Sequence, residues 1–197
     1  MDKQEVLRRC FGHGEFREGQ ETLIDALLAG RDALGIMPTG GGKSLCYQVP
    51  ALLLPGVTLV ISPLISLMKD QVMALEKAGA PAAFLNSSLS AMERRAVYDG
   101  LCQGAYRLLY VAPERLEAEN FSALARELTI PLAAVDEAHC VSQWGRDFRP
   151  SYRRIAGFLA SLPRRPAVGA FTATATDLVR RDIVELLGLR DPVRVVT

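Results

Sequence analysis

The sequence has few of the residues that build disulfide frameworks and metal sites. Its 197 residues include four cysteines and two histidines, and no two cysteines form a C-x-x-C pair. Such scatter argues against a disulfide framework or a zinc site, and we expect buried, reduced thiols. The longest apolar stretch, residues 49–65, is broken by three prolines and a glycine. We therefore expect no membrane span, and the basic start that a signal peptide requires is not followed by an apolar run.

The chain also has little net charge. Lysines and arginines number 23 and acidic residues 22, which leaves a formal charge of +1. No global basic field points to a polyanionic partner, although a local basic face needs only a few side chains. Repeats and low-complexity segments are not visible. The length suits one domain with a substantial core.

Short apolar runs alternate with amphipathic stretches along the whole chain. This alternation predicts an α/β fold in which a mostly parallel sheet is flanked by helices on both faces. We expect strands at 33–37, 58–62, 82–85, 107–111, 132–135, 167–171 and 193–196. We expect helices at 18–28, 43–53, 64–77, 91–102, 121–127, 152–162 and 176–187. Ser90 and Thr176 are candidate N-caps, Gly188 suits a helix end, and Pro50 is expected to kink or shorten its helix.

The most informative segment is the turn that follows the first predicted strand. An apolar strand leads through Thr39 into Gly40, Gly41 and Gly42, and Lys43 and Ser44 then open a helix. Glycines let backbone N–H groups surround phosphates, and a helix N-terminus favours an anion. The segment therefore predicts a P-loop, in which the lysine reaches the β- and γ-phosphates and the serine hydroxyl binds Mg²⁺. Its first position carries Met37 where the strict pattern has glycine, and the alternative is a glycine-rich turn with a chance lysine.

A second candidate site follows the strand at 132–135. This continuously apolar run, typical of a central parallel strand, ends in Asp136 and Glu137, with His139 two residues further on. Asp136 is a candidate Mg²⁺ ligand opposite Ser44, and Glu137 is a candidate base for an attacking water. A solvated strand end is the alternative for an isolated Asp-Glu pair. Together with the glycine-rich turn, the pair predicts a nucleotide site at the carboxyl ends of the strands.

Several segments together resemble the motifs of superfamily 2 helicases. Residues 40–44, 136–139 and 171–175 are similar to motifs I, II and III; residues 16–20 and 63–71 are similar to the adenine-reading motif and motif Ia. Residues 142–150 (SQWGRDFRP) resemble the aromatic-rich loop of RecQ DNA helicases. The resemblance runs through nearly the whole chain. It implies the first RecA-like domain of a RecQ-family helicase, with a RecA-like P-loop NTPase fold and ATP and Mg²⁺ as cofactors.

The resemblance also implies roles for individual residues. Adenine recognition falls to Gln20 and Arg17, with His13 where the family has a stacking aromatic. Phosphate binding falls to Thr39, Gly40, Gly41, Gly42, Lys43 and Ser44, and the catalytic set is Lys43, Asp136, Glu137 and His139. A coupling role falls to Gln143, Thr172 and Thr174, and in the family the motif with the two threonines couples the nucleotide state to domain movement; for the threonines a strand-to-helix turn stabilised by their hydroxyls is the alternative. Segments 62–69, 86–87 and 112–115 resemble further DNA-contact motifs. For Gln20 alone a helix-surface amide is the alternative, and for His139 a structural hydrogen bond.

The aromatic-rich segment can be read without the family. Trp144, the only tryptophan, and Phe148 alternate with Arg146 and Arg149. Bases of single-stranded DNA stack on aromatic rings while guanidinium groups contact phosphates. The alternative is that Trp144 anchors a loop in the core, but it lies outside any apolar period. We favour contact with single-stranded or partially duplex DNA.

We expect residues 1–197 to form one helicase ATP-binding domain, without the second RecA-like and C-terminal domains of the family. The second RecA-like domain would supply the arginine that stabilises the transferring phosphoryl group. The isolated chain is accordingly expected to bind nucleotide, hydrolyse it slowly and not unwind DNA 3′ to 5′. Alternatives are a nucleic-acid or partner-binding module without turnover, an RNA helicase domain and, least favoured, a small P-loop kinase. A cytoplasmic location, on the nucleoid when DNA is bound, is the expectation.

Overall fold

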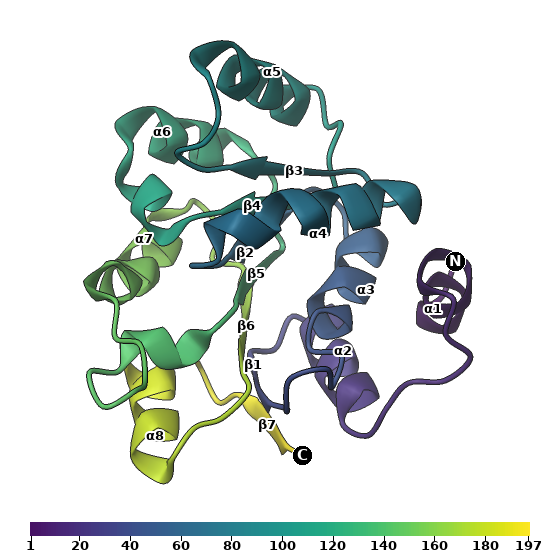
Figure 1. Ribbon diagram of the computed structural model, residues 1–197, viewed down its shortest axis with the longest axis vertical. Helices are drawn as coiled ribbons and strands as arrows, with labels where there is room; N and C mark the ends of the chain where they lie inside the picture. Colours follow the sequence, from purple (N-terminus) through teal and green to yellow (C-terminus); the bar gives the residue numbers. More distant parts are fainter.

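A computed structural model describes all residues, 1–197, and contains one seven-stranded parallel sheet (Figure 1). The strand order is β3-β4-β2-β5-β6-β1-β7. The strands are β1 Ala33–Ile36, β2 Thr58–Ile61, β3 Ala82–Leu85, β4 Leu108–Val111, β5 Leu132–Val135, β6 Ala167–Thr172 and β7 Val193–Val196. All seven predicted strands are confirmed to within one residue at each end. Six of them are apolar and almost wholly buried, as parallel strands covered on both faces must be, whereas the edge strand β7 alternates in exposure.

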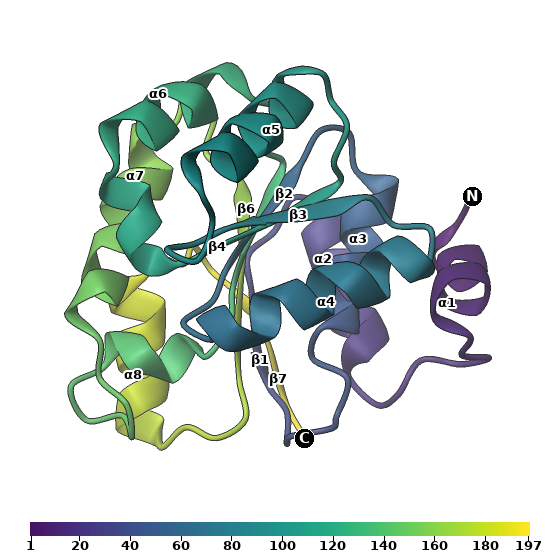
Figure 2. The ribbon, with the colours of Figure 1, turned by 45° about the horizontal axis from the view of Figure 1, so that its top comes forward.

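Helices cover both faces of the sheet (Figures 1 and 2). One face carries α2 Gln20–Leu28, α3 Leu45–Leu53 and α4 Ile65–Lys77, with α1 Lys3–Phe11 packed outside them. The other carries α5 Ala91–Cys102, α6 Glu119–Glu127, α7 Ile155–Ser161 and α8 Asp177–Leu186. Three short 3-10 turns complete the chain: η1 Pro113–Glu117, η2 Ala138–Val141 and η3 Pro150–Arg154. No helix combines the length and apolar composition needed to cross a membrane.

The helix ends follow local sequence signals. Ser90 caps α5 in a capping box with Glu93, and the Thr176 hydroxyl accepts from the Val179 N–H at 3.3 Å. Gly188 follows the end of α8 with a φ of 67°, in the left-handed region that glycine adopts easily. These three predictions are confirmed.

Four predictions about secondary structure and burial need correction. Helix α1 was not expected; a capping box between Asp2 and Glu5 starts it. The helix expected at 43–53 begins at residue 45, because the P-loop turn extends through Lys43 and Ser44, and Pro50 lies inside it without ending it before Leu53. The helix expected at 152–162 divides into η3 and α7. Cysteines 46 and 140 are buried and free, but Cys102 is exposed and Cys10 only partly buried.

The strand order places the predicted motifs together. Strand β6 lies between β5 and β1, and all three run parallel. Residues 136–139 follow β5, residues 172–174 lie at the end of β6, and residues 37–44 follow β1. These motifs therefore meet at one edge of the sheet, where open α/β proteins bind ligands.

Candidate nucleotide site

The P-loop has the backbone of a phosphate cradle. Gly40 and Gly42 have φ of 79° and 78°, and the Gly41 N–H closes the turn on the Pro38 carbonyl at 2.9 Å. A Cβ on Gly42 would lie 2.3 Å from Gln20 Nε2. The Lys43 ammonium folds back over the loop and donates to the carbonyls of Met37 (3.1 Å) and Pro38 (3.4 Å). The sequence thus places glycine where a side chain would obstruct the loop.

Two of the three predicted adenine-reading residues contact the P-loop. Gln20 opens α2 and is only 1% exposed. Its Oε1 accepts from the Arg17 N–H at 2.8 Å, and its Nε2 donates to the Gly42 carbonyl at 3.1 Å. The Arg17 guanidinium donates to the Gly40 carbonyl. His13 lies exposed after α1 and makes no side-chain hydrogen bond, so the structure does not bring it onto the loop.

The acidic pair lies at the end of β5 in two different orientations. The Asp136 N–H donates to the Ile61 carbonyl at 2.9 Å, which keeps Asp136 in line with the sheet. Glu137 has a φ of 49°, an uncommon left-handed conformation for a non-glycine residue, and begins η2. Its N–H donates to Asp136 Oδ1 at 3.0 Å. This turn separates two adjacent carboxylates, so one can face a metal ion while the other faces a water.

Burial makes the Asp136 carboxyl a weaker acid than an exposed one. Desolvation, followed by the neighbouring Glu137 carboxylate, raises the pKa of Asp136 to about 6, although the Glu137 N–H and the Lys43 charge act in the opposite direction. A cation at this position would remove that penalty, because it favours the charged form. The surroundings of Asp136 therefore disfavour its charged form, and a positive charge beside it would stabilise that form.

His139 joins the acidic turn to the end of β6. Its Nδ1 lies 2.8 Å from Thr172 Oγ1 and 3.3 Å from Glu137 Oε2. The Thr172 hydroxyl donates to the Thr174 carbonyl at 3.3 Å, so its oxygen is left to accept. Both neighbours of Nδ1 are acceptors, and this assigns the ring proton to Nδ1. Hydrogen bonds thus link His139 to Thr172 and Thr172 to Thr174, and the Glu137 carboxylate lies against the same histidine nitrogen.

The aromatic-rich loop follows η2 and is tied to it and to α8. The Ser142 hydroxyl donates to Asp182 at 2.6 Å and accepts from the Trp144 N–H at 3.1 Å. A Cβ on Gly145 would lie 2.4 Å from the His139 carbonyl, so the loop folds back directly on the histidine. The Ser142–Asp182 bond was not anticipated, because 40 residues separate the pair in sequence.

The side chains of this loop point outward. Trp144 is 66% exposed, which rules out a core anchor. Phe148 is 38% exposed and lies beneath the Arg153 guanidinium at 5.4 Å. Arg149 pairs with Asp147 at 3.0 Å, which offsets its charge, whereas Arg146 and Gln143 are exposed without such a partner. A hollow of about 340 Å³ lies between Trp144, Arg146 and the start of α8.

Two buried tyrosine hydroxyls make hydrogen bonds that the sequence did not predict. The Tyr152 hydroxyl, from η3, donates to the Asp136 carbonyl at 2.8 Å. On the other face Gln48 Nε2 donates to the Tyr110 hydroxyl at 3.1 Å. Both tyrosines are buried, and burial raises the pKa of Tyr110 to about 12. The only signal for these contacts is the presence of polar residues in otherwise apolar segments.

Comparison with known proteins agrees with this arrangement. The family described as "DEAD/DEAH box helicase" matches residues 17–181. The ATP-dependent DNA helicases RecQ of Bacillus subtilis and Pasteurella multocida are each 50% identical over 188 residues, 95% of this chain but 32% and 30% of theirs. The chain therefore spans about a third of the length of these curated relatives.

Solved structures show the same fold. The helicase MrfA bound to DNA superposes with a TM-score of 0.77 at 18% identity, and the match covers 100% of this chain and 29% of the MrfA chain. A hypothetical ATP-dependent RNA helicase from Sulfolobus tokodaii superposes with a TM-score of 0.72 at 21% identity, and the match covers 98% of this chain and 56% of the other. The chain belongs to the DEAD/DEAH box helicase family and corresponds to the N-terminal, RecA-like part of the RecQ helicases.

Proposed function

We propose that the chain binds Mg·ATP and single-stranded DNA as the ATP-binding half of a RecQ-like 3′-to-5′ DNA helicase motor. The observation that carries the proposal is the meeting of the P-loop, the Asp136–His139 turn and Thr172 at the ends of three adjacent strands. The RecQ relatives are named ATP-dependent DNA helicases. We therefore propose for this chain the ATP-dependent part of the helicase activity that those longer proteins are named for.

Phosphates would replace the contacts that the P-loop now makes with itself. Lys43 would exchange the Met37 and Pro38 carbonyls for phosphate oxygens, which are stronger acceptors because they are charged. The N–H groups of residues 40–44 would face the same anion. Gln20 and Arg17, held against the loop, would then be positioned to contact an adenine edge, and His13, which lies away from the loop here, would have to move to stack on the base.

The residues at this edge fit Mg²⁺. Mg²⁺ usually binds one or two protein oxygens and completes its octahedron with phosphates and water. Ser44 and Asp136 offer a hydroxyl and a carboxylate, and no cluster of three or more metal-ligating side chains exists to form an all-protein site. When bound, the ion would neutralise phosphate charge during transfer.

Glu137 is the proposed base for the attacking water. Its carboxylate contacts His139 Nδ1 at 3.3 Å. His139 holds that carboxylate and contacts Thr172, and the backbone links it to the Trp144 loop. A change at the γ-phosphate could therefore alter the loop that carries Trp144, Arg146 and Phe148, with Gln143 and Thr174 beside it. These side chains, with Arg149, form the proposed DNA-binding surface.

DNA-dependent ATP hydrolysis tests the proposal. ATPase rates would be measured for the 197-residue chain alone, with oligo-dT and with oligo-U of equal length. We expect ATP binding and a low rate that oligo-dT raises more than oligo-U. Glu137→Gln should lower that rate by about a hundredfold or more, as loss of a general base does. Glu76→Gln, an exposed change of the same kind on α4, should leave it unaltered.

The other outcomes separate the alternatives. Stronger stimulation by oligo-U would identify an RNA helicase domain. Nucleic-acid binding without any turnover would identify a binding module. We also propose that strand separation requires further domains, so unwinding of a 3′-tailed duplex by this chain alone would contradict that part.

A further inference from the structure

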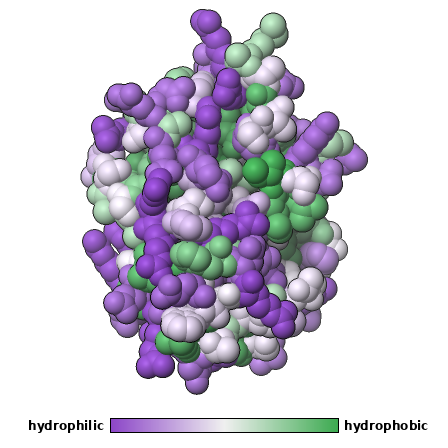
Figure 3. All heavy atoms as spheres, turned by 60° about the vertical axis from the view of Figure 1, so that its left-hand side comes forward, coloured by the Kyte–Doolittle hydropathy of each residue, from purple (hydrophilic) through white to green (hydrophobic).

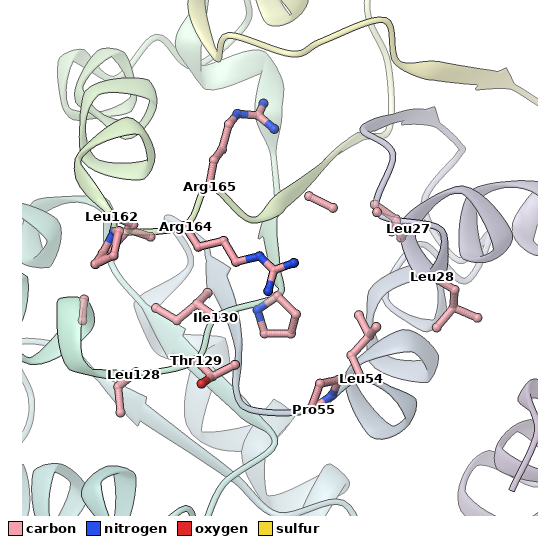
Figure 4. A pocket seen from close by; sticks show the side chains of 15 residues that line it. Leu27, Leu28, Leu54, Pro55, Leu128, Thr129, Ile130, Leu162, Arg164 and Arg165 are labelled. Carbon is pink, nitrogen blue, oxygen red and sulfur yellow. The ribbon is translucent and has the colours of Figure 1, made fainter.

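A cavity lies at the opposite edge of the sheet from the P-loop. Its volume is about 480 Å³, and it lies beneath the amino-terminal ends of β2, β5 and β6. Figure 4 shows apolar side chains on both sides, among them Leu27 and Leu54 facing Ile130 and Leu162. A cavity of this size and lining can hold one or two large apolar side chains.

Two smaller hollows extend this cavity in both directions. One of about 300 Å³ shares Leu128 and Thr129 with it and reaches Arg107 before β4. The other, of about 320 Å³, shares Gly30 and Arg165 and reaches the turn before β7. The three hollows follow the strand order from β4 to β7, and because each neighbouring pair shares lining residues we name them together the basal groove. Five strand spacings amount to about 24 Å, the length of about seven extended residues.

The basal groove has a positive rim. Arg164 is exposed, forms no ion pair, and its guanidinium reaches toward the centre of the cavity in Figure 4. Arg107 is likewise exposed and unpaired at one end. Arg165 is occupied, because it makes two hydrogen bonds to the buried Asp32 carboxylate at 3.1 and 2.7 Å. Glu127 is the one acidic side chain of the groove without an ion pair.

We propose that the basal groove binds an extended acidic segment of a partner protein. One apolar side chain of the segment would enter the 480 Å³ cavity and a neighbouring carboxylate would pair with Arg164. Arg107, Arg164 and Arg190 are exposed cations that suit an acidic ligand of either kind, but the apolar part of the cavity wall favours a peptide, whose apolar side chain can fill it. The face bearing α6, α7 and α8 is mostly hydrophilic, with its larger apolar patch toward the upper right of the view (Figure 3). Because the groove lies across the sheet from the P-loop, the segment could bind together with nucleotide.

Peptide selection tests this proposal. Random dodecapeptides displayed on phage would be selected on the 197-residue chain, and synthetic fluorescent copies of the enriched peptides measured by anisotropy. We expect peptides that combine acidic residues with apolar ones. Arg164→Glu should weaken them at least about tenfold, the loss expected for one charged hydrogen bond. Arg181→Glu, the same charge reversal at an exposed position of α8 outside the groove, should leave their affinity unchanged.

Three results would overturn the proposal. The first is no enrichment over an unrelated protein. The second is enrichment of peptides that lack acidic residues or that bind Arg164→Glu as well as the parent chain. The third is displacement of the bound peptide by oligo-dT through a site that Arg164→Glu removes, which would make the groove a nucleic-acid surface. None of these results bears on ATP hydrolysis.

Discussion

Replacing Asp136 by Asn should make the nucleotide-free chain more stable while removing its proposed metal ligand. Asn keeps the shape of the side chain and can still accept from the Glu137 N–H, which donates to Asp136 Oδ1 at 3.0 Å. It removes only the buried negative charge. The gain in stability is expected because Asp136, without a bound cation, is ionised at neutral pH against the preference of its surroundings.

The magnitude follows from the pKa. Burial and the Glu137 carboxylate raise the pKa of Asp136 from 3.8 to about 6. A shift of about two units corresponds to about 3 kcal/mol of differential free energy. Because the folded pKa is the higher one, the unfolded chain loses its proton first as pH rises. Stability is therefore lost between about pH 4 and pH 6 and stays at its lower level above that range.

Urea unfolding followed by circular dichroism would measure this effect. At pH 8 and without Mg²⁺, Asp136→Asn should exceed the parent chain in free energy of unfolding by about 3 kcal/mol. At pH 4.5 the difference should shrink to about 1 kcal/mol, since the folded carboxyl is then mostly protonated. An exposed change, Asp70→Asn on α4, should show no comparable gain.

Two results would refute this reasoning. One is a variant that is no more stable than the parent chain at pH 8. The other is a difference that does not depend on pH, since only the titration of residue 136 separates the two chains. Either would mean that the carboxylate is better solvated or better paired than its burial implies.

Three further substitutions test separate parts of the structure. Gly42→Ala places a methyl group 2.3 Å from Gln20 Nε2 and should abolish nucleotide binding in a calorimetric titration. Gly79→Ala, at the same φ of 78° but with nothing within 4 Å of the new methyl group, should leave binding intact. Equal nucleotide affinities of the two variants would contradict the claim that the glycine-rich loop binds phosphate. Asp32→Ala leaves Arg165 and the N–H groups of residues 168 and 190 without their buried partner and should lower the free energy of unfolding by about 3–5 kcal/mol, and a loss below about 1 kcal/mol would refute this. Trp144→Ala should weaken oligo-dT binding by about 1–3 kcal/mol in anisotropy, without a change in melting temperature, and unchanged binding would remove the stacking role.

The arrangement of strands could be predicted from sequence because it follows from hydrophobic periodicity. Six parallel strands are apolar on both faces, and their runs are bounded by glycine, proline or charge. Helix α1 was missed because its apolar stripe is short. The helix at 152–162 was expected as one element, but Pro150 and the Tyr152 hydroxyl bond to Asp136 hold its start in a 3-10 turn.

The candidate site divides in the same way. The spacing of Gly42, Lys43 and Ser44 specifies a local turn, so sequence alone identifies it. Contacts such as Ser142 to Asp182, or His139 to Thr172, join residues 40 and 33 positions apart. They depend on which strands become neighbours, and periodicity does not encode that order. The exposure of Trp144 is likewise a tertiary property.

The most direct test of the whole account is equilibrium binding of a fluorescent ATP analogue to the 197-residue chain in Mg²⁺. We expect saturable binding that weakens at least about tenfold in Lys43→Ala, because that variant loses a charged hydrogen bond to phosphate. Lys77→Ala, an exposed lysine on α4, should bind like the parent chain. Absence of binding by the folded chain, or binding that does not depend on Lys43, would contradict the claim that this edge of the sheet is a nucleotide site.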